Sequence, residues 1–313
     1  MKEEILMKKM FLTALVGVLF LSGCGAATLD GGSSDSDSKT AEKKPDELVV
    51  GVSVSTLNNP FFVSLADGVN KLADENKSTV KVLDAQDDTA KQSNDVDDLI
   101  QQGVDVLLIN PVDSSAIVPA VEAANAANIP VIAIDRSSDG GTLLTTVASN
   151  NEEGGKMAGE FIVEKLGENA KVVELEGVPG ASATRERGKG FDDFAAEKLD
   201  VLDKQSANFD RAEGLTVMEN MLQAHGDVQG VFAQNDEMAL GAAEAAQSKG
   251  KDFIIVGFDG TEDGLKAIEE GRMTATIAQK PEEMGRLALQ AAYDHFAGKE
   301  VEEKIDSPLE LKQ

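Results

Sequence analysis

From Leu48 onward, short apolar segments alternate with longer amphipathic ones. The amphipathic segments repeat apolar residues with a helical period, as in Phe61, Leu65, Val69 and Leu72. The apolar segments have the length and flanking turn residues of strands, and they lie at residues 48–55, 79–84, 104–110, 131–135, 145–149, 171–177, 228–234, 253–258 and 274–279. Strands that alternate with helices form parallel sheets covered on both faces. The pattern therefore predicts an α/β fold.

Two stretches of the chain share the order and spacing of these segments. Residues 107–136 and 231–260 each contain an apolar strand followed by Asn, an Ala-rich helix, and an apolar strand ending in Asp. The length of 313 residues also favours two sheets over one. We therefore expect two doubly wound parallel-sheet domains, in which these stretches are equivalent units.

The N-terminal residues are predicted to direct export. Two lysines precede an apolar run from Met10 to Leu21, which is shorter than the roughly 20 residues of a membrane-spanning helix. The segment from Leu21 to Cys24 resembles the bacterial lipobox, in which the cysteine is lipidated. Residues 1–23 are expected to be a lipoprotein signal peptide, and the alternative is an ordinary signal peptide with an incidental cysteine.

Residues 24–46 are rich in Gly, Ser, Asp and Lys and nearly free of apolar side chains. Such a composition cannot bury enough surface to order itself, so this segment is predicted to be a flexible tether. Anchor, tether and folded body together predict a protein held at the extracytoplasmic face of the cell membrane through lipid on Cys24.

Composition excludes several classes of function. The chain has 56 acidic and 29 basic residues and a formal net charge of -27, which repels nucleic-acid phosphates, and no basic patch offsets that repulsion. A single cysteine excludes an internal disulfide and a Cys-based zinc cluster, and the distant His225 and His295 leave little for a metal. We therefore expect no nucleic-acid partner, no metal, no cofactor and no catalytic residue.

Polar residues stand at the ends of several predicted strands, where ligands bind in open parallel sheets. They are Asn59, Asn110, Asp135, Arg136, Asn235, Asp259 and Gln279. Each could instead cap a helix or stabilise a turn. As a set, carboxylates accept hydrogen bonds, guanidinium groups donate them and amides do both, which suits a neutral polyhydroxyl ligand.

Phenylalanines lie beside these polar strand ends, at Phe61, Phe62, Phe209 and Phe258. A sugar has an apolar C–H face and a hydroxyl rim, so flat rings with polar groups around their edge would match it. Each ring by itself could equally belong to the core. Together with the polar strand ends, the rings predict a pocket.

These residues lie in motifs that resemble the ribose-binding proteins of bacterial ABC importers. The motifs run in order from about Leu48 to the C-terminus: STLNNPFFVSLADG (55–68), LLINPVDS (107–114), ANIPVIAIDR (127–136), RERGKGF (185–191), NFDRAEGL (208–215), VFAQNDEMALGA (231–242), VGFDGT (256–261) and TIAQ (276–279). The resemblance implies a type I periplasmic-binding-protein fold, whose two domains are joined by three crossover strands. It further implies an N-terminal lobe of residues 47–149 plus 280–307, a C-terminal lobe of residues 150–279 plus 308–313, and a monomer.

The resemblance also implies a set of ligand-binding residues in the cleft between the lobes. They are Asn59, Phe61, Phe62, Asn110, Asp135 and Arg136 on the first side, and Arg187, Phe209, Asn235, Phe258, Asp259 and Gln279 on the second, with Ser149 as a weaker candidate behind them. The implied ligand is D-ribose or a similar monosaccharide, captured by hinge closure and delivered to the membrane subunits of an ABC permease.

Other interpretations stay open. The same fold could bind another pentose, a hexose or a furanose signal, or serve a chemoreceptor or sensor. Asp135 and Asp259 could in principle act as the acid and base of a sugar-acting enzyme, although the neighbouring guanidinium groups are expected to keep both ionised. Sugar-responsive repressors share the fold, but the signal and tether stand here in place of their DNA-binding motif.

Overall fold

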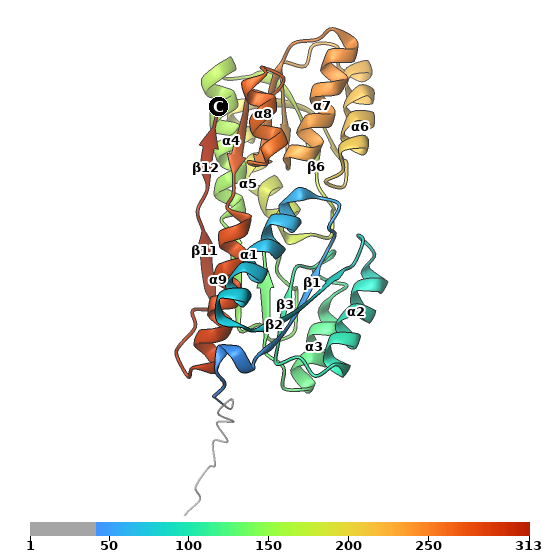
Figure 1. The fold of residues 1–313 in the computed structure, drawn as a ribbon. Coiled ribbons are helices and arrows are strands. Elements are labelled where there is room, and N and C mark those ends of the chain that lie inside the picture. The colour runs from blue at the N-terminus through green and yellow to red at the C-terminus, as the bar shows by residue number, and fades with distance from the viewer. Residues whose placement is uncertain (1–41) are drawn as a thin grey trace, which may run out of the picture. The chain divides into compact units, whose positions relative to one another are not determined.

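The computed structural model describes residues 42–313 and contains two six-stranded sheets (Figure 1). The predicted signal peptide, Cys24 and the tether up to residue 41 lie outside the described residues. The first sheet has the order β11-β5-β4-β3-β1-β2 and consists of β1 (Val49–Val54), β2 (Thr79–Asp84), β3 (Val106–Ile109), β4 (Val131–Ile134), β5 (Thr145–Ser149) and β11 (Lys304–Ser307). The second has the order β12-β10-β9-β8-β6-β7 and consists of β6 (Ala170–Glu176), β7 (Leu199–Ser206), β8 (Gly230–Ala233), β9 (Ile254–Asp259), β10 (Ala275–Ala278) and β12 (Glu310–Lys312).

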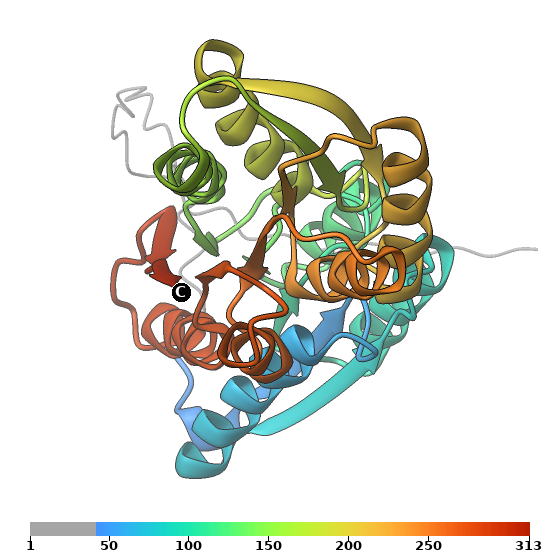
Figure 2. The same cartoon turned by 90° about the horizontal axis from the view of Figure 1, so that it is seen from above.

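Helices cover both faces of each sheet, and Figure 2 shows them on both sides of the strands. The first lobe contains α1 (Pro60–Asn76) and α9 (Pro281–Phe296) on one face of its sheet, with α2 (Thr89–Gln101) and α3 (Val118–Ala126) on the other. In the second lobe, α4 (Asn151–Leu166) and α5 (Ser182–Lys198) cover one face, and α6 (Arg211–Ala224), α7 (Asp236–Lys249) and α8 (Glu262–Glu269) cover the other. Each sheet is thus buried on both faces, as parallel sheets require.

The two sheets have equivalent strand orders, and the chain passes between them at three points. It leaves the first sheet after β5, returns after β10, and crosses again from β11 to β12, which follow one another along one edge in Figure 1. The strand pairs are parallel except for β10 with β12. The predicted pair of doubly wound sheets joined by three crossovers is confirmed, and the repeated stretches correspond to β3-α3-β4 and β8-α7-β9.

Glycines allow helix pairs in each lobe to approach closely. A side chain at Gly68 of α1 would place its Cβ 2.0 Å from the carbonyl oxygen of Glu282 in α9. In the second lobe a Cβ at Gly155 of α4 would lie 2.0 Å from the carbonyl oxygen of Arg187 in α5. Because real Cβ atoms cannot approach so closely, glycine at Gly155 sets the depth at which α4 packs on the segment that carries Arg187.

Some elements differ from the sequence predictions. The edge strand β7 was not predicted, because its sequence LDVLDKQS is largely polar and none of its residues is fully buried. The short strands β11 and β12 were missed as well. Within the predicted tether, Pro45–Glu47 form a 3-10 helix, the Lys43 amide donates to the Phe296 carbonyl oxygen, and the Lys43 ammonium pairs with Asp105. The end of that segment is therefore packed on the first lobe, since it has specific partners there.

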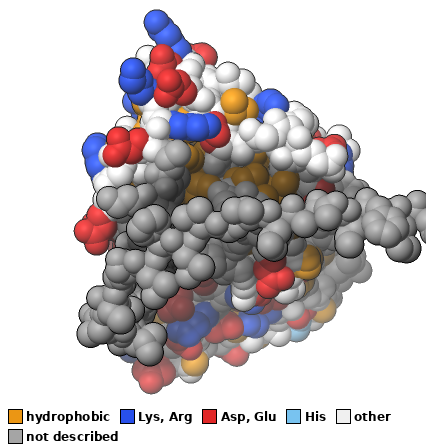
Figure 3. Space-filling model, turned by 90° about the horizontal axis from the view of Figure 1, so that it is seen from below, with side chains coloured by type: hydrophobic (Ala, Val, Ile, Leu, Met, Phe, Trp, Pro, Cys, Tyr) orange, Lys and Arg blue, Asp and Glu red, His pale blue; other side chains and the backbone are white. Residues whose placement is uncertain are grey.

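Acidic and basic side chains are interspersed on the uncovered part of the face drawn in Figure 3. Within residues 42–313, no helix is long and apolar enough to cross a membrane, and no group of three or more His, Cys, Asp and Glu side chains is arranged to hold a metal ion.

Candidate functional site

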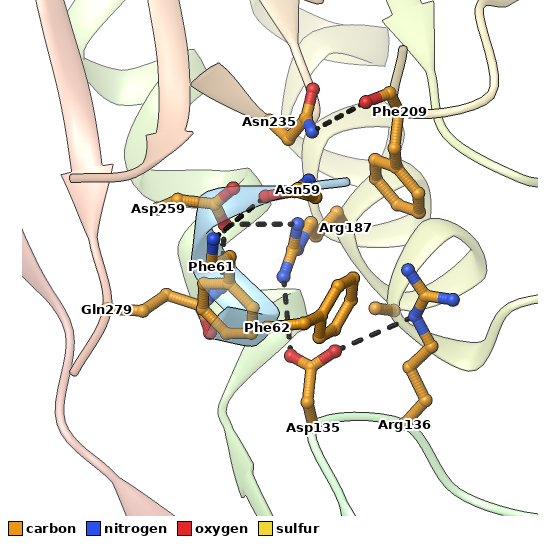
Figure 4. A pocket seen from close by; sticks show the side chains of 11 residues that line it. Asn59, Phe61, Phe62, Asp135, Arg136, Arg187, Phe209, Asn235, Asp259 and Gln279 are labelled. Atoms are coloured by element: carbon orange, nitrogen blue, oxygen red, sulfur yellow. Dashed lines mark hydrogen bonds and ion pairs between the residues drawn. The ribbon is translucent and has the colours of Figure 1, made fainter. Parts of the chain in front are cut away.

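A pocket lies between the carboxyl ends of the two sheets, and side chains from both lobes enclose it (Figure 4). Of the twelve predicted ligand-binding residues, all except Asn110 and Phe258 line it: Asn59, Phe61, Phe62, Asp135, Arg136, Arg187, Phe209, Asn235, Asp259 and Gln279, together with Ala183. The weaker candidate Ser149 does not line this pocket. The two exceptions lie behind the lining and contact it. Asn110 supports Asp135, and the Phe258 ring packs against the Arg187 guanidinium. The structure therefore gathers the predicted residues at one place, while their binding role stays a prediction.

Asp135 is held at the end of β4 by its backbone and by Asn110. Its amide donates to the Val147 carbonyl oxygen at 2.8 Å, and its φ of 64° turns the chain sharply into the cleft. The Asn110 amide nitrogen donates to Asp135 Oδ2 at 3.2 Å and to the Ile134 carbonyl oxygen at 3.0 Å. These bonds leave Asp135 Oδ1, which has no hydrogen-bond partner among the described residues.

Arg187 reaches from α5 toward acidic groups on both lobes. Its Nη2 lies 4.0 Å from Asp135 Oδ1, and its Nη1 lies 3.9 Å from Asp259 Oδ1 (Figure 4). Nε donates to Asn151 Oδ1 at 2.9 Å, and Nη1 donates to the Gln234 carbonyl oxygen at 2.7 Å. The guanidinium carbon also lies 3.8 Å from the centre of the Phe258 ring. Arg187 is thus held in place by groups outside the pocket.

Arg136 and three phenylalanines form the opposite wall. The guanidinium carbon of Arg136 lies 5.0 Å from the Phe62 ring centre and 5.1 Å from that of Phe209. Nη1 donates to the Pro111 carbonyl oxygen at 3.1 Å, whereas Nε has no hydrogen-bond partner in the described part of the chain. Phe61 and Phe62 meet edge to face, with 5.2 Å between ring centres. Rings from both lobes thus flank a wall that also presents a charged donor.

The predicted capping roles of the strand-end amides are also present. Asn59 Oδ1 accepts from the Phe61 amide at 2.9 Å at the start of α1, and Asn235 Oδ1 accepts from the Met238 amide at 2.9 Å at the start of α7. The Asn235 amide nitrogen donates to the Phe209 carbonyl oxygen at 3.1 Å. Capping and lining the pocket are therefore compatible, because a cap fixes the side chain where the strand ends.

Burial controls the ionisation of the two pocket carboxylates. Desolvation raises the pKa of Asp135, and the guanidinium groups of Arg136 and Arg187 oppose that rise. Desolvation also raises the pKa of Asp259 well above its usual value, against the opposing effect of Arg187. The arginines therefore favour the ionised carboxylates without cancelling the effect of burial on their pKa values, and the expectation that they keep both groups ionised stays a prediction.

Direct hydrogen bonds join the lobes beside the pocket. The Ser114 amide donates to the Gly180 carbonyl oxygen at 3.0 Å, the Ser182 amide donates to Ser114 Oγ at 3.1 Å, and the Ser137 amide donates to Ser182 Oγ at 3.0 Å. An exposed ion pair between Arg185 and Asp139, 2.7 Å apart, lies at the edge of this contact. We call these residues the interlobe contact. Nothing in the sequence predicts this contact, because its serines form no distinctive pattern.

The amino-acid sequence is similar to those of known proteins. Residues 50–300 match the family model described as periplasmic binding protein domain. The chain is 58% identical over 275 residues to the ribose import binding protein of Bacillus subtilis, covering 88% of this chain and 90% of that protein. It is 52% identical over 268 residues to the ribose import binding protein of Escherichia coli, covering 84% and 90%.

Solved structures share the two-lobed fold. A Caulobacter myo-inositol binding protein bound to myo-inositol has a TM-score of 0.81 and 32% identity, covering 85% of this chain and 93% of that one. A galactofuranose binding protein has a TM-score of 0.81 and 30% identity, covering 85% and 94%.

A series of hydrogen-bonded, buried polar groups connects Arg187 to the interior of the second sheet. Glu174 of β6 is fully buried, and its Oε1 accepts from the Gln234 amide nitrogen at 2.8 Å. Gln234 Oε1 accepts from the Gly177 amide at 3.0 Å, and the Gln234 carbonyl oxygen accepts from Arg187. Burial raises the pKa of Glu174 to about 8, and the Lys204 ammonium, 3.8 Å from Oε2, offsets little of that rise. Neither Glu174 nor Gln234 was predicted to belong to the site, because no motif marks Glu174, and Gln234 lies within the motif of residues 231–242 but outside the pocket lining.

We expect Glu174→Gln to reduce the loss of stability as pH rises from 4.5 to 8. The pKa of Glu174 is about 8 in the folded protein, against an ordinary 4.5. The folded state therefore keeps a proton that the unfolded chain has released. The contribution of Glu174 to the free energy of unfolding is fully present below pH 4.5. It falls by up to about 1.4 kcal/mol per pH unit and is lost as pH rises through 8. Urea unfolding of both proteins from pH 5 to pH 9 checks this, and an identical pH dependence in the two would contradict it.

Proposed function

The chain belongs to the periplasmic binding protein family, and from this premise we propose that it captures D-ribose or a similar monosaccharide in the cleft between its lobes and delivers it to an ABC permease. The observation that carries the proposal is the pocket itself, which combines carboxylates, guanidinium groups and amides with flanking phenylalanine rings from both lobes. The relatives from Bacillus subtilis and Escherichia coli are both named ribose import binding proteins.

The chemistry of the lining suits a sugar that is bound and released unchanged. Phe61, Phe62 and Phe209 would pack on apolar C–H surfaces of the ring. Asp135 Oδ1 and Gln279 Oε1 are buried and lack partners among the described residues, and a sugar hydroxyl could donate to each of them. Hydrogen bonds to charged groups contribute about 1.5–3 kcal/mol each. A few of them, after the cost of ordering, are compatible with the about -8 kcal/mol of micromolar binding.

Closure of the lobes would follow from the placement of these groups. The ligand would bridge Asp135 and Arg136 of the first lobe to Arg187 and Asp259 of the second, so both halves are satisfied only when the lobes meet. The interlobe contact stabilises the same arrangement without touching the pocket. Closure by ligand would therefore be assisted by direct hydrogen bonds between the lobes.

The site offers less support for catalysis than for binding. Asp135 and Asp259 both lie beside Arg187, and each is anchored by an amide, from Asn110 and Gln279 respectively. Such anchoring positions carboxylate oxygens as acceptors for the hydroxyl groups of a ligand. The related proteins reported above are named as binding proteins. We therefore propose a non-enzymatic role, with another pentose, a furanose or a cyclic polyol as the alternative ligand.

We further propose that the protein is held at the extracytoplasmic face of the cell membrane as a lipoprotein. This proposal rests on the apolar run followed by Leu21-Ser22-Gly23-Cys24 and on the polar composition of the tether. A diacylated N-terminus would supply the two chains that stable anchoring needs.

The wild-type protein should bind D-ribose in calorimetry with micromolar or tighter affinity, while Asp135→Ala and Arg187→Ala should lose detectable binding. Each substitution removes a charged partner of the ligand and leaves the opposing charges buried and unpaired. Arg286→Ala is the matched control, because Arg286 pairs with Glu75 on the exposed surface. Near-unchanged affinity in the first two variants would overturn the assigned site. If the wild type bound a different sugar and not D-ribose, ribose would be wrong as the ligand but the role of a sugar-binding protein would stand.

Ser182→Ala should weaken D-ribose binding by roughly fivefold, mainly through faster dissociation, since one interlobe hydrogen bond is lost and the Ser137 amide is left unpaired. Release of radiolabelled ribose and small-angle X-ray scattering of the ligand-free protein would measure the rate and the opening. Ser93→Ala on α2 is the control, because Ser93 Oγ donates to the Thr89 carbonyl oxygen within its own helix. If Ser182→Ala released ribose at the wild-type rate, the interlobe contact would not stabilise closure.

Cys24→Ala should abolish incorporation of labelled palmitate and release the exported chain from bacterial membranes. The reason is that the thiol would be the attachment point of the lipid. Ser33→Ala, a change within the same tether, should leave labelling and fractionation as in the wild type. Labelled, membrane-bound Cys24→Ala protein would contradict the proposed anchor.

A further inference from the structure

One buried carboxylate, Asp236, connects segments from three neighbouring strands of the second lobe. It follows Asn235 after β8 and is fully buried. Its Oδ2 accepts from the Thr261 amide at 2.7 Å and from Thr261 Oγ1 at 3.0 Å, just beyond the end of β9. Its Oδ1 accepts from Thr276 Oγ1 of β10 at 2.6 Å. Three consecutive strands of the sheet therefore share one acceptor group.

The donors around Asp236 are themselves fixed in direction. Thr276 Oγ1 accepts from the Gly260 amide at 3.3 Å, and Thr261 Oγ1 accepts from the Gly264 amide at 3.1 Å. Each hydroxyl thus accepts from an amide and has its own proton available for Asp236. An ionised carboxylate, which only accepts hydrogen bonds, fits this ring of donors. Burial raises the pKa of Asp236 to about 6, and the Thr276 and Thr261 donors oppose the rise.

Two glycines provide the space for this carboxylate. A Cβ at Gly257 would lie 2.3 Å from Asp236 Oδ1, and a Cβ at Gly264 would lie 2.3 Å from Oδ2. Side chains at those positions would push the carboxylate away from the strand ends. Glycine on β9 and on α8 therefore leaves the space that the Asp236 carboxylate occupies.

The first lobe joins its strand ends by different chemistry. Pro111 occupies the position that corresponds to Asp236 in the repeated stretch, and Gln92 of α2 acts there instead. The Gln92 amide nitrogen donates to the Asn110 carbonyl oxygen at 2.8 Å, and its Oε1 accepts from the Val112 amide at 2.8 Å. A neutral amide thus supports one lobe, while a carboxylate supports the other.

We propose that Asp236 is the positioning residue of the second-lobe half of the pocket. Asn235 precedes it directly, Asp259 lies two residues before Thr261, and Gln279 lies three residues after Thr276. By holding these three segments in one mutual arrangement, Asp236 sets the spacing of the groups that meet the sugar and hence the selectivity among sugars. Asp236 itself does not line the pocket. This inference rests on the proposed function.

The test compares Asp236→Asn and Thr276→Val with the wild type in calorimetry with D-ribose, D-xylose and 2-deoxy-D-ribose. Asparagine keeps the shape but replaces one acceptor by a donor, and valine removes only the hydroxyl that joins β10 to Asp236. Thr145→Val is the matched control, because Thr145 lies buried in β5, the equivalent strand of the first sheet, and its hydroxyl has no partner in the described part of the chain.

Both test variants should raise the Kd for D-ribose about tenfold and lower the ratio of the D-xylose Kd to the D-ribose Kd, while Thr145→Val stays within about twofold. A substitution that only destabilises the fold would lower the unfolding midpoint without changing this ratio. Unchanged Kd values and ratios in Asp236→Asn and Thr276→Val would therefore overturn the positioning role. Thr276→Val provides the answer if Asp236→Asn does not fold.

A ligand-free measurement separates this inference from the proposed function. If the wild-type protein binds none of these sugars or any other monosaccharide, the proposed function fails and hydrogen exchange decides the role of Asp236. Amides in residues 258–262 and 275–280 should exchange faster in Asp236→Asn and in Thr276→Val than in the wild type and in Thr145→Val. Equal exchange in all four proteins would overturn the inference.

Discussion

The contact of Arg187 with one carboxylate from each lobe is the constraint on which the site depends. Its guanidinium belongs to the second lobe, yet it lies within 4.0 Å of Asp135 in the first lobe and of Asp259 in its own. Burying such charges is costly, so they persist only where geometry and hydrogen bonds compensate. The cluster therefore favours an arrangement in which the lobes meet, and a ligand that supplies the remaining hydrogen bonds would strengthen it.

The surrounding fold can be understood as support for that cluster. Gly155 lets α4 approach the α5 backbone at Arg187, Asn151 and Gln234 orient the guanidinium, and Glu174 holds Gln234 from inside the sheet. Each of these supports is either a buried polar side chain or a glycine. Residues of both kinds lower the stability of the fold unless the neighbouring structure compensates. The protein thus keeps polar groups in its core where they fix the direction of pocket side chains, because apolar side chains cannot supply directional bonds.

The two lobes share a topology but differ in chemistry. Equivalent strand orders place Asn110 and Asn235 after the matching strands β3 and β8. Asp135 and Asp259 lie at the ends of the neighbouring strands β4 and β9. The groups behind them diverge, since Gln92 supports the first lobe and Asp236 the second. A repeated fold therefore provides two sets of strand ends facing each other, while substitutions behind those ends make the two halves of the cleft unequal. Such inequality is what an asymmetric ligand requires.

Much of this organisation was predictable from the sequence, and the remainder depends on distance in space. Local periodicity determined the α/β alternation and the main strands, and strand-end chemistry together with recognisable motifs identified the residues that line the pocket. Periodicity could not reveal β7, an edge strand with many polar residues that pairs with β6 alone. Only the tertiary structure decided that burial outweighs the arginines in setting the pKa of Asp135, that serines join the lobes, and that Asp236 connects three neighbouring strands. These depend on solvent exclusion and on contacts between residues far apart in the chain, and neither is encoded in local sequence patterns.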